Sequence, residues 1–304
     1  MGVGLRVGRL QDDLFSEEGF SRFEQVAVDA LVEAANHSPS KVAKVRHLFE
    51  AGRSQVEVLG NVARGIELPI TKEKPYSIDE NIWGCAIECG EMEDLWNEPP
   101  GDVWRMTQDP AEAPKGSKEI TLAFQEGLPV AIDGEILPPV LLMERLNKLA
   151  GDYGVGRIDM VENRVVGLKS REVYEGPAAV VLHMAHRELE RVVLDRATSQ
   201  YKAKIAQDFA TLIYDGLWFG PLREAMQAFI DSTQEMVTGD VRLRLSAGLC
   251  RVTGRRSPFS LYDDGLATYS DGDTFDHTAA EGFMKLYGLS YRTWGRVRRR
   301  GGLS

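Results

Sequence analysis

The order of strand-like and helix-like segments is the feature that most constrains the fold of this chain. Residues Val241 to Leu245 alternate strictly between apolar and basic side chains, and Leu249 to Thr253 follows across a turn at Ala247-Gly248. This pattern predicts a half-buried antiparallel hairpin. A second pair of strands is predicted at Glu119–Phe124 and Leu128–Ile132. Because strands and helices do not alternate regularly, we expect an α+β fold with a mainly antiparallel sheet.

Long helices and an extended C-terminal segment complete this fold. Apolar residues recur at helical spacing between Pro138 and Gly151. The stretch Glu175–Ile230 is dominated by long helices, with a break near Trp218–Pro221. A final helix is predicted over Thr278–Leu286, and the basic tail from Arg296 to Arg300 is interpreted either as a solvated helix end or as a contact between subunits.

The first part of the chain has a different character. Residues 1–53 are predicted to form helices after a short irregular start, and a further helix from about 54 to 64 ends at Gly65. Residues 71–118 are rich in Pro, Asp, Glu and Trp and are predicted to be mostly ordered loop, since disordered segments are poor in aromatic residues. We therefore expect an atypical helical segment at 1–64 and the main domain at 65–304.

Composition restricts the class of protein. The 304 residues can bury a core, and a net charge of −10 argues against a general nucleic-acid-binding protein, which carries a basic excess. Cys85, Cys89 and Cys250 make neither a disulfide framework nor the usual zinc spacing. The chain has no apolar stretch of about 18 residues and no signal pattern at its N-terminus. We expect a cytoplasmic protein that binds neither membranes nor nucleic acid.

Two polar segments carry the functional prediction. Thr71–Gly84 and Gly154–Arg164 are dense in charged residues and are interrupted by Gly or Pro, which is typical of loops that contact a ligand. Together they resemble the C-terminal domain of argininosuccinate synthase. The resemblance extends in order and spacing over about Gly65–Gly288, with further similar runs at Trp96–Pro100, Lys169–Arg171, Asp195–Arg196, Tyr214–Trp218, Ser257–Pro258, Ser260–Tyr262 and Gly272–Asp273.

This resemblance implies an enzyme activity. Family members are carbon–nitrogen ligases that join citrulline to aspartate at the expense of ATP, through a citrullyl-adenylate, and release AMP. The reaction belongs to arginine biosynthesis. The resemblance also implies ATP with Mg²⁺ as cofactor, citrulline and aspartate as substrates, and a homotetramer as the assembly.

Four positions match the residues with which the family contacts citrulline. Ser77 supplies a hydroxyl, Glu162 a carboxylate suited to the α-ammonium group of citrulline, and Tyr174 a phenol. The fourth position is commonly Ser in the family but is Ala86 here, and alanine cannot make that hydrogen bond. The missing bond would cost about 0.5–1.5 kcal/mol of binding free energy.

Each of these residues also has a purely structural interpretation. Ser77 follows Pro-Tyr and would cap a turn or a short helix. Glu162 lies between Asp159 and Arg164, so that a structural salt bridge is an alternative. Tyr174 would then be an ordinary half-buried aromatic residue. From the sequence we assign no catalytic residue, no cofactor-binding residue and no metal ligand.

One family motif is not found. Family members begin with a Ser-Gly-Gly-x-Asp loop, a type of loop that binds phosphate through backbone N–H groups at a helix N-terminus, and this chain contains no such loop. The chain is therefore expected to be truncated and to lack an ATP site of its own. Two alternatives stay open: a non-catalytic module that oligomerises or binds citrulline, and a split enzyme whose nucleotide domain is supplied by another chain.

Overall fold

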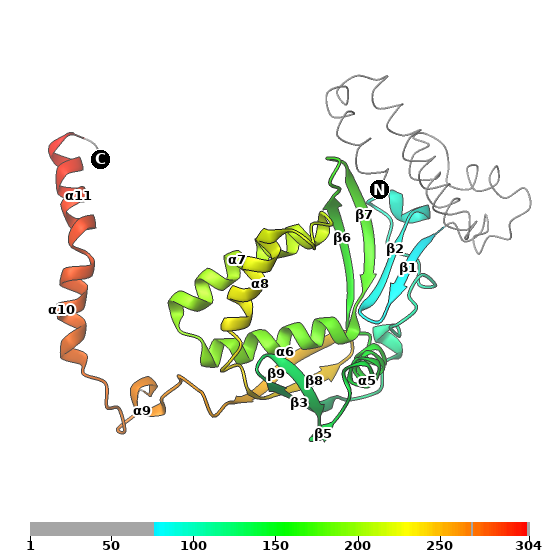
Figure 1. The fold of residues 1–304 in the computed structure, drawn as a ribbon, viewed down its shortest axis with the longest axis horizontal. Helices are drawn as coiled ribbons and strands as arrows, with labels where there is room; N and C mark the ends of the chain where they lie inside the picture. Colours follow the sequence, from blue (N-terminus) through cyan, green and yellow to red (C-terminus); the bar gives the residue numbers. More distant parts are fainter. Residues whose placement is uncertain (1–75, 269, 303–304) are drawn as a thin grey trace, which may run out of the picture. The chain divides into compact units, whose positions relative to one another are not determined.

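The computed structural model describes residues 76–268 and 270–302. The helices predicted within 1–64 therefore lie outside the described residues. The chain divides into two compact units. The described part of the first unit comprises residues 76–109 and 156–177, and that of the second comprises residues 110–155 and 178–302 without residue 269. Figure 1 shows the elements of both units.

The first unit is built on a four-stranded antiparallel sheet. Its strand order is β1-β2-β7-β6, with β1 at Ser77–Asn81, β2 at Gly84–Glu88, β6 at Arg157–Asn163 and β7 at Lys169–Glu175. The tight turn between β1 and β2 is closed by a hydrogen bond of 2.8 Å from the Trp83 N–H to Asn81 Oδ1. A short 3₁₀ helix, η1, follows at Gly90–Glu93.

One face of this sheet carries a small core. Because side chains alternate across a strand, Cys85 and Ile87 of β2 share a face, and Val173 of β7 is paired with Ile87. These three side chains are buried together with Met92 and Val103. The opposite side of the same strands is polar and includes Glu88 and Tyr174.

A buried carboxylate joins the loop before residue 110 to this sheet. Glu175 is 1% exposed. It accepts hydrogen bonds from the backbone N–H groups of Arg105, Met106 and Thr107, at 2.7, 3.0 and 2.9 Å, and from Thr107 Oγ1 at 2.6 Å. Arg157 Nε in turn donates to Thr107 Oγ1 at 2.7 Å. The loop is therefore ordered by hydrogen bonds to a single side chain, which satisfies the rule that buried charges are paired.

The second unit contains a five-stranded antiparallel sheet of order β5-β4-β3-β8-β9. Its strands are β3 Lys118–Gln125, β4 Leu128–Ile132, β5 Glu135–Ile136, β8 Gly239–Ser246 and β9 Leu249–Arg256. The remaining elements are η2 Pro110–Glu112, α5 Pro139–Gly151, α6 Pro177–Val193, α7 Arg196–Tyr214, α8 Pro221–Ser232, α9 Asp264–Ala267, α10 His277–Tyr287 and α11 Leu289–Arg300.

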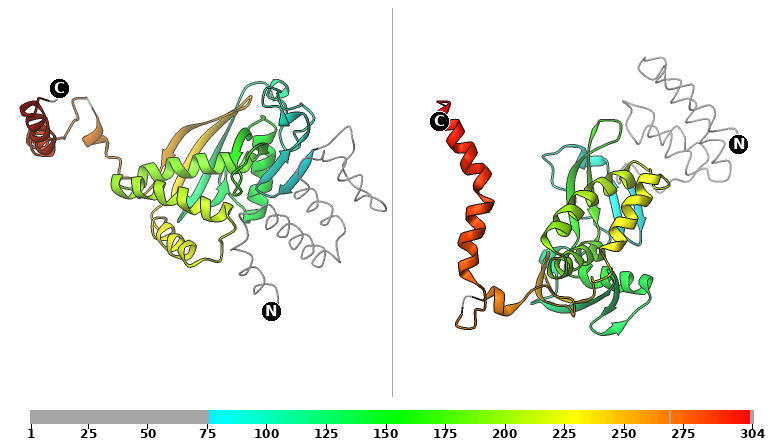
Figure 2. Two further views of the ribbon diagram at one scale, coloured as in Figure 1. Left: turned by 90° about the horizontal axis from the view of Figure 1, so that it is seen from above. Right: turned by 60° about the vertical axis from the view of Figure 1, so that its left-hand side comes forward.

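The core of this unit lies between the sheet and α6. Figures 1 and 2 show α6 running across one face of the strands. Val181 and Leu189 of α6 are fully buried in one cluster with Leu122 of β3, Leu243 of β8 and Leu146 of α5. The alternating pattern of β8 follows from this arrangement, because only one face of the strand is covered.

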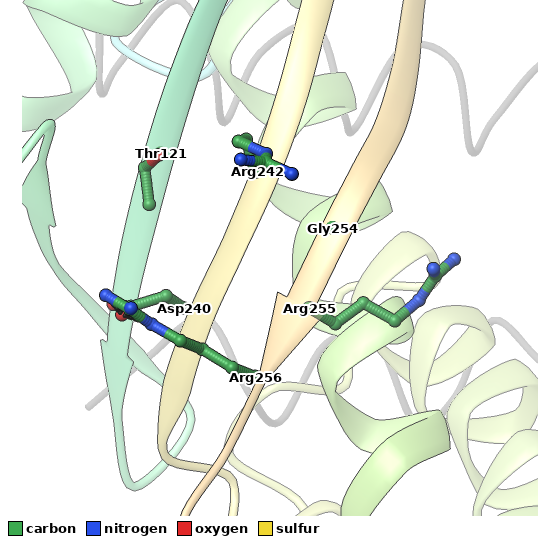
Figure 3. Close-up of a pocket in the computed structure, with 6 residues that line it drawn as sticks. All are labelled: Thr121, Asp240, Arg242, Gly254, Arg255 and Arg256. Carbon is green, nitrogen blue, oxygen red and sulfur yellow. Dashed lines mark hydrogen bonds and ion pairs between the residues drawn. The ribbon is translucent and has the colours of Figure 1, made fainter.

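The opposite face of the five-stranded sheet is polar, and a hollow of about 270 Å³ lies over it (Figure 3). The Arg242 guanidinium lies against Gly254, where an added Cβ would stand 3.2 Å from Arg242 Nη2. Arg256 pairs with Asp240 at 2.6 Å. The charged side chains that line the hollow are all engaged in ion pairs, and the hollow includes none of the residues predicted to bind a ligand.

The strand and helix predictions for the second unit are confirmed. The hairpin β8–β9, the pair β3–β4 and the helix α5 lie where the sequence predicts them, and the helical region breaks before α8. All strand pairs are antiparallel, which confirms the α+β fold class. No helix within the described residues is long and apolar enough to cross a membrane.

Two expectations need correction. Residues 71–118 were expected to be mostly ordered loop, and most of the described part does lie outside strands and helices, but this part also contains the hairpin β1–β2, which was not predicted. Its first strand, with the sequence SIDEN, has only one apolar residue, so that its alternation is not visible in the sequence. The helix predicted at 278–286 is present as α10 but is not the final helix, because α11 forms a separate helix of 12 residues that ends in the basic tail.

Candidate functional site

The register of the four-stranded sheet brings the four predicted residues to one face. Residues that pair directly in an antiparallel sheet have side chains on the same side, as do alternate residues along a strand. Ala86 pairs with Tyr174, and Ser77 pairs with Glu88, which lies two residues after Ala86. Glu162 pairs with Ser170, which lies four residues before Tyr174 on β7. All four positions therefore face away from the core of this unit.

Tyr174 is at the centre of this polar face. Its hydroxyl lies 2.7 Å from Glu162 Oε2 and 2.6 Å from Glu172 Oε2. Burial raises the pKa of the phenol, and the hydrogen bonds with Glu172 and Glu162 raise it further. Tyr174 is therefore protonated at neutral pH and is available as a hydrogen-bonding group.

Arg164 joins the carboxyl groups of three strands. Its guanidinium contacts Glu88 of β2 and Glu172 of β7, and its Nε lies 3.6 Å from Glu162 Oε1 of β6. Burial acts to lower the pKa of Arg164, but Glu172, Glu88 and Glu162 together hold it above its usual value. The guanidinium thus remains charged and holds three carboxyl groups close together.

Ser77 occupies the end of this face, because β2 separates β1 from β7. Its side chain is only 7% exposed, and it lies in a strand rather than at a helix or turn cap. The neighbouring Cys89 has a backbone φ of +76°. Burial, with Glu88 and Glu93 nearby, raises the pKa of the Cys89 thiol to about 12, so that Cys89 is not a nucleophile at neutral pH.

The structure therefore assembles the predicted residues to different degrees. Glu162 and Tyr174 are in direct contact, Ala86 lies opposite Tyr174 in the register, and Ser77 lies one strand further away. The group that we call the carboxyl cluster consists of Glu88, Glu162 and Glu172 with Arg164 and Tyr174. Glu88 and Glu172 were not predicted. Arg164 was considered in the sequence only as a structural salt-bridge partner of Glu162, and the two side chains do lie 3.6 Å apart. The spacing of two residues between Glu172 and Tyr174 on one strand was the signal in the sequence that pointed to Glu172.

The chemistry of the carboxyl cluster favours a cationic group. Three carboxyl groups share one guanidinium, so that the cluster has an excess of negative charge. An ammonium group brings a positive charge and three hydrogen-bond donors, which complement carboxylates and a phenolic oxygen. A polyphosphate does not fit the same place, because its charge repels the carboxylates and the single guanidinium is already engaged.

The described residues offer no metal centre. They include no group of three or more His, Cys, Asp or Glu side chains that could hold a metal ion. His186, which shares a helix face with His183, lies 2.8 Å from Gln234 Oε1. Burial lowers the pKa of His186, so that its ring is neutral at pH 7.

This combination defines an α+β protein whose smaller sheet carries a carboxyl cluster on the face opposite its core. The sequence profile described as "Arginosuccinate synthase C-terminal domain" matches residues 76–294, which include this sheet and most of the second unit. The chain belongs to the argininosuccinate synthase family.

Individual relatives agree with this assignment. The chain is 51% identical over 256 residues to an argininosuccinate synthase of Chlorobaculum parvum, an alignment that covers 84% of this chain and 64% of that protein. It is 51% identical over 249 residues to the one from Chlorobium phaeobacteroides, covering 82% and 62%. An alignment with the enzyme from a Synechococcus species gives 49% identity over 280 residues and covers 92% and 69%. The chain thus spans somewhat under two thirds of the length of the first two relatives.

Proposed function

We propose that this chain provides the citrulline-binding part of an argininosuccinate synthase. The contact between Tyr174 and Glu162 within an acidic sheet face is the observation that supports this most strongly. Citrulline carries an α-ammonium group, and Glu162 is its partner in the proposal. Tyr174 supplies a phenol that both orients Glu162 and contacts the ligand, and Ser77 contributes a hydroxyl from β1.

The full reaction is a further part of the proposal. Joining citrulline to aspartate requires ATP with Mg²⁺, and the ligase would form a citrullyl-adenylate before aspartate displaces AMP. The contribution of the described residues would be to bind and orient citrulline, which is a large part of catalysis when reactants must meet in one geometry. The domain would begin near residue 65, and the protein would be cytoplasmic. Aspartate and the nucleotide would bind through residues outside the carboxyl cluster.

A non-catalytic module that binds citrulline or oligomerises is the second candidate. The observation that favours it is Ala86, which lies opposite Tyr174 and lacks the hydroxyl that the family commonly has at this position. Both candidates keep the citrulline site, so binding alone does not separate them. Formation of argininosuccinate and AMP from labelled citrulline, aspartate and Mg-ATP would identify the ligase, and binding without product would identify the module.

Assembly into a homo-oligomer, a tetramer as in the family, belongs to the same proposal. The helices α10 and α11 have no buried residue among those described. They nevertheless carry large apolar side chains, including Phe283, Leu286, Tyr291 and Trp294. Exposed apolar surface of this extent is typical of protein–protein contacts. A second copy of the chain is the partner that we propose for it.

Calorimetry with citrulline tests the binding site. We expect the purified chain to bind citrulline and Glu162→Gln to bind it about 10- to 100-fold more weakly, because a hydrogen bond to a charged group is worth about 1.5–3 kcal/mol. Glu80→Gln, on the opposite face of the same sheet, is the matched control and should leave affinity unchanged. Equal affinity of Glu162→Gln and the parent protein would exclude Glu162 as the ammonium partner.

A further inference from the structure

The Tyr174 hydroxyl has one proton but two carboxyl neighbours. The Tyr174 oxygen lies 2.7 Å from Glu162 Oε2 and 2.6 Å from Glu172 Oε2, and both distances are those of hydrogen bonds. A phenol donates one hydrogen bond, while an ionised carboxylate can only accept. If both carboxyl groups were ionised, one of the two contacts would place the Tyr174 oxygen and a carboxylate oxygen at hydrogen-bond distance with no proton between them. A second proton is therefore needed on one of the two carboxyl groups.

Glu172 is better placed than Glu162 to hold this proton. Both side chains are largely covered, but Glu172 lies on the inner strand β7 between β2 and β6, whereas Glu162 lies on the edge strand β6. Burial raises the pKa of Glu172. A hydrogen bond that Tyr174 would donate to the ionised form of Glu172 opposes this effect, Glu88 and Glu162 add to it, and Arg164 counteracts it.

A proton on Glu172 Oε2 satisfies every group in the chain of contacts. The Glu172 hydroxyl donates to the Tyr174 oxygen, and the Tyr174 hydroxyl donates to Glu162 Oε2. The other oxygen of Glu172 continues to accept from Arg164. Such a fully connected network is stable in a partly buried site, whereas a network with one missing proton is not.

Charge balance links this proton to a ligand. The charged groups of the described residues that face Glu172 are Glu88 from β2, Glu162 from β6 and Arg164 just after β6, with Asp79 further away on β1. If all three carboxyl groups of the cluster were ionised, they would exceed the charge of Arg164 by two. The proton on Glu172 removes one of these two negative charges. A bound ammonium group would neutralise the same charge if Glu172 were ionised.

We propose that Glu172 is a second carboxyl group of the ligand site, that it holds one proton in the ligand-free protein, and that it releases this proton when the ammonium group of an amino-acid ligand binds beside Glu162. The O–H bond of the carboxylic acid breaks, the proton passes to the solvent, and the ammonium takes over its charge and its role as donor. The charge of the cluster is the same before and after binding. Only the release step rests on the proposed binding of citrulline; the proton in the ligand-free protein does not.

The ligand-free protein tests the first half of this proposal. We would titrate the protein labelled with carbon-13 at the glutamate carboxyl groups and follow the chemical shifts by NMR. We expect one carboxyl group to remain protonated to a pH well above the ordinary range of glutamate, and its signal to be absent in Glu172→Gln. Ordinary titration of the Glu172 signal would overturn the proposal. So would a late-titrating signal that persists in Glu172→Gln, because it would belong to Glu88 or Glu162.

Citrulline binding tests the second half. Calorimetry in buffers of different ionisation enthalpy counts the protons released with each ligand. At a pH below the pKa of Glu172 in the ligand-free protein, we expect about one for the parent protein and none for Glu172→Gln. Below the pKa of Glu172 the affinity of the parent should fall about tenfold for each unit of pH, whereas that of Glu172→Gln should stay level over the same range. At higher pH we expect Glu172→Gln to bind about tenfold more weakly, because its amide cannot become an anion.

The outcomes separate the inference from the function on which it partly depends. Binding of citrulline without proton release would overturn the exchange and leave the proposed function standing. Absence of citrulline binding would overturn both the proposed function and the exchange, while the NMR titration would still decide where the proton lies. Glu80→Gln serves as the control in both experiments, because Glu80 faces the opposite side of the sheet and should change neither the titration nor the proton count.

Discussion

Position 86 was expected from the resemblance to contact citrulline, but its alanine has no hydroxyl to offer a ligand. Ala86 lies opposite Tyr174 in the register of β2 and β7 and is partly exposed, so that a serine there would add its oxygen beside the phenol without entering the core. We expect Ala86→Ser to strengthen citrulline binding by about two- to tenfold, the equivalent of one neutral hydrogen bond. Calorimetry measures this directly. Ala123→Ser on β3, a partly exposed strand position of the other unit, is the matched control, and an unchanged affinity in Ala86→Ser would show that position 86 does not reach the ligand.

Among the elements of the fold, the strands β6 and β7 depend on a glycine that comes before the first of them. Gly156 has φ of +113°, and an added Cβ would lie 2.6 Å from backbone atoms of Pro177. Its carbonyl also accepts a hydrogen bond of 2.9 Å from the Gly176 N–H. Gly167, between the same strands, has φ of +87° but open space around it. We expect Gly156→Ala to lower the free energy of unfolding by about 2–4 kcal/mol and Gly167→Ala by only about 1 kcal/mol, because the second change adds backbone strain without a clash. Urea denaturation of the two variants tests this, and equal losses would contradict it.

The same elements show which parts of the fold can be predicted from the sequence. The hairpin β8–β9 was predictable because its inner residues, such as Val241 and Leu243, are buried while Arg242 between them is exposed. The hairpin β1–β2 was not, because one of its faces carries polar or small side chains and β1 supplies little to the core. The carboxyl cluster was only partly predictable from the sequence. Glu162 and Tyr174 were predicted from motifs, and Arg164 was considered as a neighbour of Glu162. The approach of Glu88 and Glu172 to Arg164 depends on strand pairing, which sequence spacing does not specify.

At the scale of the whole molecule, the two units differ in how they are stabilised. The second unit has a large apolar core in which α6 covers a sheet. The first unit has a small core, and much of its order comes from hydrogen bonds such as those of Glu175 and from the ion pairs of Arg164. A sheet that is polar on one face has fewer positions left for apolar residues. The carboxyl cluster and the small core are therefore two consequences of the same arrangement.

The helices α10 and α11 lead to the prediction that concerns the assembly. Phe283 and Trp294 are 61% and 60% exposed, although apolar residues of this size are usually covered in a folded protein. Isolated helices of 11 and 12 residues are also marginal in water, so that a partner surface is needed to stabilise them. We expect the parent protein to sediment as a homo-oligomer and the double variant Phe283→Ser/Trp294→Ser to sediment as a smaller species. The matched control Glu281→Ser/Arg296→Ser changes two polar residues on the same helices and should keep the parent's size. If both double variants sedimented like the parent, these helices would not be the contact between subunits, and another surface of the second unit would have to hold the oligomer together.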